Sequence, residues 1–113
     1  MRRTCPIEIK RGGDFELNCA LRNSGAAVPI TGWQVDCWLR GPDGRLVQRL
    51  TVDLVDPDTG RYRIVAKPLQ TSVWPVGDLD ADIRYLDGSG RVMHTATFTV
   101  SVLAAITTPA ITP

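Results

Sequence analysis

The stretch Trp33-Gln34-Val35-Asp36-Cys37-Trp38-Leu39-Arg40 places an apolar side chain at every second position. A period of two predicts a β-strand with one buried face. Gly41-Pro42-Asp43-Gly44 follows directly. It is a strong turn sequence, because proline presets φ and glycine tolerates positive φ. Alternation resumes between Arg45 and Val55, so these segments predict two antiparallel strands joined by a tight turn.

Alternation of apolar and polar residues recurs along most of the chain, and turn residues separate the alternating segments. We expect seven strands, at residues 6–10, 15–21, 33–40, 45–55, 62–66, 78–85 and 92–102. The one irregular crossing holds Trp74-Pro75, and a single helical turn over 71–73, capped by Thr71, is expected there. Short strands at turn spacings of roughly ten residues predict an all-β fold, an immunoglobulin-like antiparallel sandwich.

A chain of 113 residues has the size of one domain. We expect the sandwich to occupy residues 1–106 and residues 107–113 to form an extended C-terminal arm, because the prolines of that segment cannot serve a central strand. The last strand alternates most clearly, and its phase predicts an inward set of Val92, His94, Ala96, Phe98, Val100 and Val102. The predicted core comprises Leu17, Cys19, Leu21, Trp33, Val35, Cys37, Leu39, Leu50, Val52, Leu54, Ile64, Ile83, Tyr85, Phe98 and Val100.

The formal net charge is +1, so no strong field predicts nucleic acid or an anionic membrane as a partner. No apolar run approaches the roughly 18 residues that span a bilayer. The arginines at the start are followed by Ile7-Glu8-Ile9-Lys10 and not by an apolar stretch. We therefore expect no secretory signal and folding in a cytoplasm. Cys5, Cys19 and Cys37 are then expected to stay reduced.

Three aspartates at alternate positions of Asp78-Leu79-Asp80-Ala81-Asp82 imitate the start of a calcium-binding loop. The match ends there, because Ile83 stands where the loop requires glycine and Ser89 where it requires a bidentate glutamate. We expect the three carboxylates to share one face of a strand. There they would pair with arginines on neighbouring strands, such as Arg40.

His94 is the only histidine, and Cys37 is the nucleophile that it could activate. The two are expected on the seventh and third strands with the sixth between them, about 10 Å apart. The cysteines and His94 also come from four separate segments, whereas structural zinc sites usually draw their ligands in close pairs. The sequence therefore predicts no catalytic, cofactor or metal site, and we expect no enzyme.

Trp38 is the outward-facing aromatic residue of its strand, since its neighbours Cys37 and Leu39 point inward. Arg40 follows on the same face and could cover the indole ring by stacking. Tryptophan and arginine are also the residue types that anchor interfaces. Two interpretations stay open, a tryptophan that is merely covered by its neighbour and a contact surface for another protein.

Several turn and core motifs occur in an order that resembles phage and prophage structural proteins. They are Ile9-Lys10-Arg11-Gly12-Gly13-Asp14-Phe15, Ile30-Thr31-Gly32-Trp33-Gln34-Val35, Val73-Trp74-Pro75-Val76-Gly77, Asp82-Ile83-Arg84-Tyr85 and Thr95-Ala96-Thr97-Phe98-Thr99-Val100. The chain is similar to the immunoglobulin-like N-terminal domain of siphophage upper baseplate proteins, and to small immunoglobulin-like tail or virion accessory proteins. The likeness runs from Ile7 to Leu103. It concerns turns and core positions, and so it supports the fold more than any activity.

The resemblance implies a non-enzymatic tail, baseplate or accessory subunit of a virion, made in the bacterial host cytoplasm. Its expected partners are other phage structural proteins in a symmetric assembly, with neither nucleic acid nor membrane. We place the contacts at Trp38, Arg40, Thr107, Thr108, Pro109 and Ile111. The alternatives are a capsid decoration protein and a carbohydrate-binding adhesion module. The latter usually shows several aromatics on one face, and aromatic residues make up only 6% of this chain.

Overall fold

The computed structural model describes residues 7–95 and 97–106. This described part of the chain contains ten strands, one α-helical turn and one 3-10 turn. The strands are β1 (Ile7–Lys10), β2 (Phe15–Ala20), β3 (Arg22–Asn23), β4 (Ala26–Ala27), β5 (Gln34–Arg40), β6 (Leu46–Asp56), β7 (Arg61–Ala66), β8 (Gly77–Leu86), β9 (Val92–His94) and β10 (Phe98–Leu103). The helix α1 spans Pro68–Thr71, and the 3-10 turn spans Pro57–Thr59. The predicted all-β class is confirmed.

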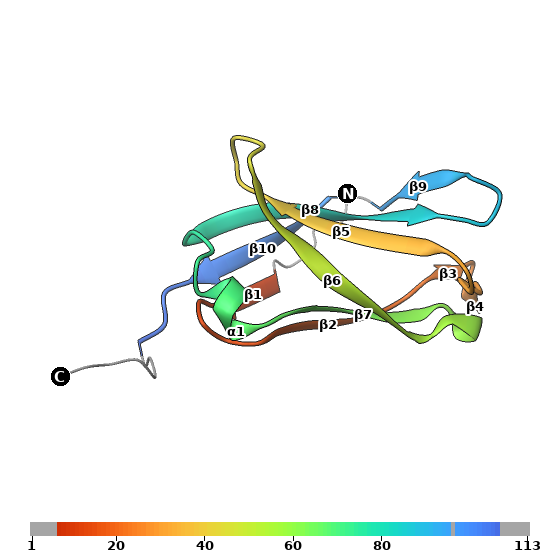
Figure 1. The fold of residues 1–113 in the computed structure, drawn as a ribbon, viewed down its shortest axis with the longest axis horizontal. Coiled ribbons are helices and arrows are strands. Elements are labelled where there is room, and N and C mark those ends of the chain that lie inside the picture. Colours follow the sequence, from red (N-terminus) through yellow and green to blue (C-terminus); the bar gives the residue numbers. More distant parts are fainter. Residues whose placement is uncertain (1–6, 96, 107–113) are drawn as a thin grey trace.

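Two layers of strands enclose the core, and β6 belongs to both (Figure 1). The first half of β6 pairs with β5, in the layer that also holds β1, β10, β8 and β9. Its second half pairs with β7, which in turn pairs with β2. The small β3–β4 hairpin stands apart from this sheet. The long strand therefore turns from one layer of the sandwich into the other.

One strand pair departs from the expected antiparallel pattern, because β1 runs parallel to β10. Parallel neighbours need a long connection, and almost the whole chain lies between these two strands. The strand β1 lies at one edge of the sheet and falls within the segment 6–10 that was predicted as a strand. Pro6, the first residue of that predicted strand, lies outside the described residues.

The predicted uninterrupted strand over 92–102 is wrong, because the segment pairs with β8 in two different registers. Met93 on β9 lies opposite Tyr85, and Phe98 on β10 lies opposite Ala81. The two pairs are five residues apart on the β9–β10 side and four apart on β8. One additional residue is therefore accommodated between β9 and β10, as in a β-bulge.

This additional residue exchanges the two faces of the strand, because side chains alternate at every position. Val92 and His94 are exposed, contrary to the inward orientation predicted for them. Val100 and Val102, beyond the shift, are fully buried as predicted. Ala96 lies outside the described residues. The reversal moves the only histidine from the expected interior to the outer face.

The core draws side chains from both layers and from the loops between them. Its buried residues are Ile9, Phe15, Ile30, Val35, Cys37, Leu39, Leu50, Tyr62, Ile64, Ala66, Trp74, Leu79, Ala81, Ile83, Tyr85, Val100 and Val102. Six other predicted core residues are partly buried and pack against it: Leu17, Cys19, Leu21, Trp33, Val52 and Phe98. The prediction for Leu54 is wrong, since it is 39% exposed. Leu54 lies opposite buried Tyr62, but the pairing shifts register directly after it.

Two cysteines and two tyrosines of the interior are uncharged at neutral pH. Cys19 and Cys37 are free thiols, and burial raises the pKa of Cys37 to about 12. The hydroxyls of Tyr62 and Tyr85 form a hydrogen bond with each other inside the core, where burial raises the pKa of both groups. Cys5 lies outside the described residues.

The helical turn lies three residues earlier than predicted, and Thr71 ends it instead of capping its start. Pro68 occupies the first turn, where its missing N–H costs nothing. Thr71 is fully buried. Its Oγ1 donates a hydrogen bond to the carbonyl of Gly13 (2.7 Å) and accepts one from the N–H of Gly12 (3.1 Å). Thr71 therefore attaches α1 to the turn between β1 and β2.

Replacing Thr71 by valine, which keeps the shape of the side chain, is expected to lower the free energy of unfolding by about 1–3 kcal/mol, because the Gly12 N–H and the Gly13 carbonyl lose their partner. Urea denaturation followed by circular dichroism measures the change. The control is Ser72→Ala, whose exposed hydroxyl only donates to the Leu69 carbonyl and should contribute less than about 0.5 kcal/mol. Equal effects of the two substitutions would contradict the role assigned to Thr71.

Candidate functional site

The outer face of β5 presents Asp36, Trp38 and Arg40, because the intervening residues of the strand are buried in the core. Trp38 lies opposite Arg49 of β6 on one side and Asp82 of β8 on the other. These three strands thus bring cationic, aromatic and acidic side chains into one row. We call this outer surface of β5, β6, β8 and β9 the Trp38 face.

Two arginines hold the Trp38 side chain, which is 38% exposed. The guanidinium carbon of Arg49 lies 4.5 Å from the centre of the ring, and that of Arg40 lies 5.5 Å away. Cations at these distances are attracted to the face of an indole ring. Arg40 also donates a hydrogen bond to the carbonyl of Gly44 (2.9 Å). The stacking of Arg40 on Trp38, which the sequence left open, is therefore present, and Arg49 is a second partner that sequence reasoning did not find.

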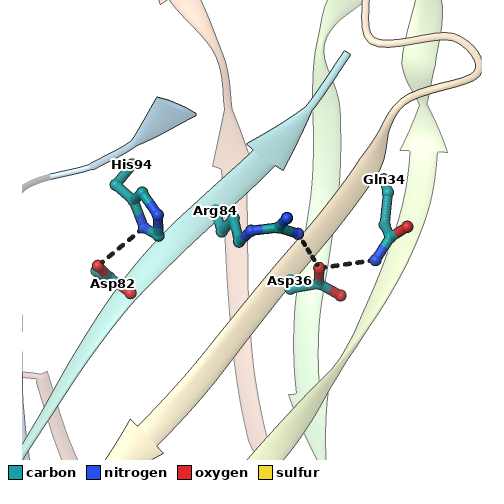
Figure 2. A network of polar contacts seen from close by, with 5 residues as sticks. All are labelled: Gln34, Asp36, Asp82, Arg84 and His94. Atoms are coloured by element: carbon teal, nitrogen blue, oxygen red, sulfur yellow. Dashed lines mark hydrogen bonds and ion pairs between the residues drawn. The ribbon is translucent and has the colours of Figure 1, made fainter. Parts of the chain in front are cut away.

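Polar side chains of β5, β8 and β9 form pairs on this face (Figure 2). Arg84 Nη1 and Asp36 Oδ2 are 3.2 Å apart, and Gln34 Nε2 donates to the same carboxylate oxygen at 3.0 Å. His94 Nδ1 lies 3.2 Å from Asp82 Oδ2. Exposed pairs of this kind contribute about 0–1 kcal/mol each.

The aspartates of β8 share one outward face, as predicted, but arginines are not their main partners. Asp78 accepts a hydrogen bond from Ser101 Oγ at 2.7 Å, and Asp82 pairs with His94. Asp80 lies directly opposite Arg40 in register, although the Arg40 guanidinium donates to a carbonyl of its own turn. Among the described residues no arginine pairs with Asp78 or Asp82, so the arginine pairing expected for these two aspartates is not found there. The β-bulge, which carries His94 to this face, accounts for the difference at Asp82.

A hollow of about 900 Å³ lies over this face. Residues that line it include Trp38, Arg40, Arg49, Asp80, Asp82 and His94. Guanidinium donors, carboxylate acceptors and an aromatic ring border the same space, so it offers both apolar contact and directional hydrogen bonds. A protruding segment of another molecule fits these properties.

The structure keeps Cys37 and His94 apart, as the sequence predicted. Cys37 points into the core beneath the face, while His94 lies on the outside with β8 between their strands. Within residues 7–95 and 97–106, no group of three or more histidine, cysteine, aspartate or glutamate side chains could hold a metal ion. No helix of this described part is long and apolar enough to cross a bilayer. The predicted contact residues Thr107, Thr108, Pro109 and Ile111 lie outside it.

No protein-family model matches the chain, and no curated protein matches it in sequence. The fold is similar to three solved structures. The N-terminal domain of phage TP901-1 ORF48 has a TM-score of 0.60 and 16% identity, with 87% of this chain and 84% of that chain covered. CopC from Methylosinus trichosporium OB3b has a TM-score of 0.54 and 11% identity, with 88% and 84% covered. The SrpA adhesin R347E mutant from Streptococcus sanguinis has a TM-score of 0.54 and 20% identity, with 89% of this chain and 56% of that chain covered.

These three likenesses concern the fold, because sequence identities of 11–20% do not carry site residues from one chain to another. They agree with the predicted β-sandwich. The likeness predicted from turn and core motifs, to the N-terminal domain of a phage baseplate protein, has a structural counterpart in the phage TP901-1 domain.

Proposed function

We propose that this chain is a non-enzymatic structural protein of a bacteriophage, a tail- or baseplate-associated virion subunit that binds neighbouring virion proteins through the Trp38 face. The observation that carries the proposal is the exposed indole ring of Trp38, held by Arg40 and Arg49 beside a hollow. The fold likeness to the N-terminal domain of phage TP901-1 ORF48 supports the assignment to a phage.

The geometry around Trp38 suits protein binding for an energetic reason. Tryptophan and arginine are enriched among the residues that dominate interface energies. A side chain that is already held in place loses little conformational entropy when a partner covers it. Arg49 stacks on the ring from the neighbouring strand, so the anchor is ordered before any partner arrives. The charged pairs around it, such as Asp36–Arg84, would form the polar rim of the contact.

The proposed partners are other structural proteins of the same particle, arranged symmetrically. A domain of this size gains limited affinity from one contact, and many copies on one particle would supply the remainder as avidity. The protein would be made in the host cytoplasm and reside in the virion, with neither nucleic acid nor membrane as a partner. A position as a capsid decoration protein would use the same surface in the same way.

A surface glycan is the weaker occupant of the Trp38 face. Sugar-binding sites place a pyranose ring flat against an exposed aromatic face. Here the guanidinium of Arg49 lies 4.5 Å from the centre of the Trp38 ring and covers one of its faces. The fold likeness to the SrpA adhesin concerns the scaffold and not this site.

Trp38→Ala is expected to reduce the number of copies on purified particles at least about tenfold, the loss typical of an interface anchor. The protein would be produced together with the structural proteins encoded beside it, and copies would be counted by quantitative mass spectrometry. Arg49→Glu should act in the same direction. The matched control is Arg61→Glu, which changes an exposed arginine of β7 in the other layer and should leave incorporation unchanged.

Folding is checked separately, because an unfolded variant would also be lost from particles. Trp38→Ala should change the free energy of unfolding by about 1 kcal/mol or less, since its side chain is a surface group. Normal incorporation of folded Trp38→Ala and Arg49→Glu would refute the proposed contact surface. Specific binding of the wild type to a glycan array, lost in Trp38→Ala, would favour the carbohydrate-binding alternative instead.

A further inference from the structure

The strand β2 lies at the edge of the second layer, because it pairs with β7 on one side and with no described strand on the other. It contains neither proline nor lysine, and its pairing with β7 has no register shift. Proline, lysine and β-bulges commonly protect an edge strand, whose unpaired backbone groups can otherwise bind another strand. The edge of β2 has none of these three features and can therefore accept a further strand.

The register of β2 identifies the backbone groups that face this open edge. The Leu21 N–H donates to the carbonyl of Gly60 at 2.9 Å, directly beyond the last pair of the β2–β7 register. In an antiparallel pair, residues that bond to the neighbouring strand alternate with residues whose N–H and carbonyl groups point away from it. The residues of β2 that point away from β7 are therefore Glu16, Asn18 and Ala20.

The side chains along the edge also alternate between two faces. Those of the three residues just named are exposed on the outer face of β2. Leu17 and Cys19 are on the inner face and are only partly buried, although both pack against the core. A strand added at this edge would cover both of them. The edge of β2 thus offers apolar contact in addition to its backbone groups.

Charges are distributed unequally along the edge. Asp14 and Glu16 lie at its start, and Arg22 lies two residues beyond its end. All three residues are exposed, and none of them forms an ion pair within the part of the chain that the structure describes. Arg22 borders a hollow of about 350 Å³ together with Asn18 and Ala20. An antiparallel strand of the same sequence would bring its acidic end to this arginine.

We propose that two copies of the chain pair through their β2 strands, antiparallel and about a two-fold axis at Asn18. In this register Asn18 lies opposite the partner's Asn18, and Glu16 lies opposite the partner's Ala20. The backbone groups of these residues would exchange about six hydrogen bonds across the axis. Arg22 is diagonal to the partner's Glu16, a position that long side chains reach. The second layers of the two copies would then form one continuous sheet.

A second copy suits this edge because the pattern of its charges is self-complementary. Antiparallel pairing reverses the strand, so the acidic start of each copy meets the basic end of the other. A parallel partner of the same sequence would instead place like charges side by side. The two-fold axis also repeats every contact, so each favourable pair occurs twice.

Sedimentation velocity of the full wild-type chain at low ionic strength should show a monomer–dimer equilibrium that shifts to the dimer as concentration rises. Asn18→Pro should weaken the dimer at least about tenfold, because it removes the central N–H donor from both copies. Proline is tolerated on an edge strand where its missing N–H faces away from the neighbouring strand, so circular dichroism should show an unchanged fold. The matched control is Asn18→Ala, which keeps the N–H and should retain the dimer.

Charge reversal tests the register without a change in the backbone. Glu16→Arg and Arg22→Glu should each weaken the dimer about tenfold, because like charges then meet twice across the axis. The double variant that carries both substitutions should restore the dimer, since opposite charges meet again. The matched control is Glu8→Arg, which makes the same change at an exposed residue of β1, the edge strand of the other layer, and should leave pairing unchanged.

Amide hydrogen exchange measured by NMR locates the contact. The amides of Glu16, Asn18 and Ala20 should exchange slowly at concentrations where the dimer dominates and rapidly where the monomer does. A chain that stays monomeric at every concentration would overturn the inference. A dimer that Asn18→Pro and both charge reversals leave intact would also overturn it. Slow exchange of these amides in the monomer would do the same, because the chain itself would then cover the edge.

The inference does not depend on the proposed function, and the two can fail separately. Trp38→Ala should leave the dimer unchanged, because Trp38 lies on the outer face of β5, in the other layer. If folded Trp38→Ala is lost from particles while the wild-type chain stays monomeric, only the pairing through β2 is refuted. If the wild type pairs through β2 while Trp38→Ala and Arg49→Glu are incorporated normally, only the proposed contact surface is refuted.

Discussion

Replacing Trp74 by alanine is expected to lower the free energy of unfolding by about 3–5 kcal/mol, the cost of deleting a buried tryptophan side chain. Trp74 is fully buried. Its ring packs edge-to-face on Phe15 with 5.7 Å between the ring centres, and its Nε1 donates to Gln48 Oε1 at 3.3 Å. The substitution leaves a large cavity between the two layers and removes the partner of Gln48.

Guanidinium denaturation followed by far-ultraviolet circular dichroism measures this loss, since fluorescence would change with the number of tryptophans. A small domain has a total stability of about 5–15 kcal/mol, so Trp74→Ala should leave it close to unfolding at 37 °C. Trp38→Ala is the matched control because it deletes the same side chain at the surface. Similar losses at both positions would contradict the central place of Trp74 in the core.

Gly60→Ala is the second substitution with a large expected effect. Gly60 ends the 3-10 turn after β6 with φ of 74°, in the left-handed region. A Cβ atom there would lie 2.5 Å from the carbonyl oxygen of Val28 and 2.8 Å from that of Leu21. These are backbone atoms that cannot rotate away. Moreover, the Leu21 N–H donates to the Gly60 carbonyl at 2.9 Å, so any shift also strains a hydrogen bond.

The expected loss for Gly60→Ala combines about 1–2 kcal/mol for the left-handed backbone with about 1–3 kcal/mol for overpacking. Gly44→Ala is the matched control, because Gly44 has φ of 83° and a Cβ there would meet nothing within 4 Å. It should lose only the first contribution. Thermal and chemical denaturation of both variants would test the difference, and equal losses would contradict the close contact at Gly60.

The arrangement of side chains on the Trp38 face was only partly visible in the sequence. Alternation placed Trp38 and Arg40 on the outside of β5, and both are there. Arg49 was also in an outward phase, but its position over Trp38 depends on a register that shifts between Leu39 and Arg40. A shift of this kind leaves no mark in a periodic pattern. His94 was placed inside, because the β-bulge that reverses its face has no local signal.

The sequence by itself determined most local features of this protein: the strands other than the β3–β4 hairpin and the separation of β9 from β10, the turns, and the buried face of β5 and β8. The reason is that successive side chains of a strand point to opposite sides, so the apolar pattern alone states which side is buried. Proline and glycine likewise specify turns through their own backbone restrictions. None of this requires knowledge of a neighbouring strand.

Only the tertiary structure decided which strands are neighbours and in what register. The parallel pairing of β1 with β10, the passage of β6 between the layers and the bulge before β10 all depend on residues far apart in the chain. So does the attachment of the segment after α1 to the end of β10 through Arg11. Such pairings are selected by the energy of the whole packed core, and each short segment is compatible with several of them.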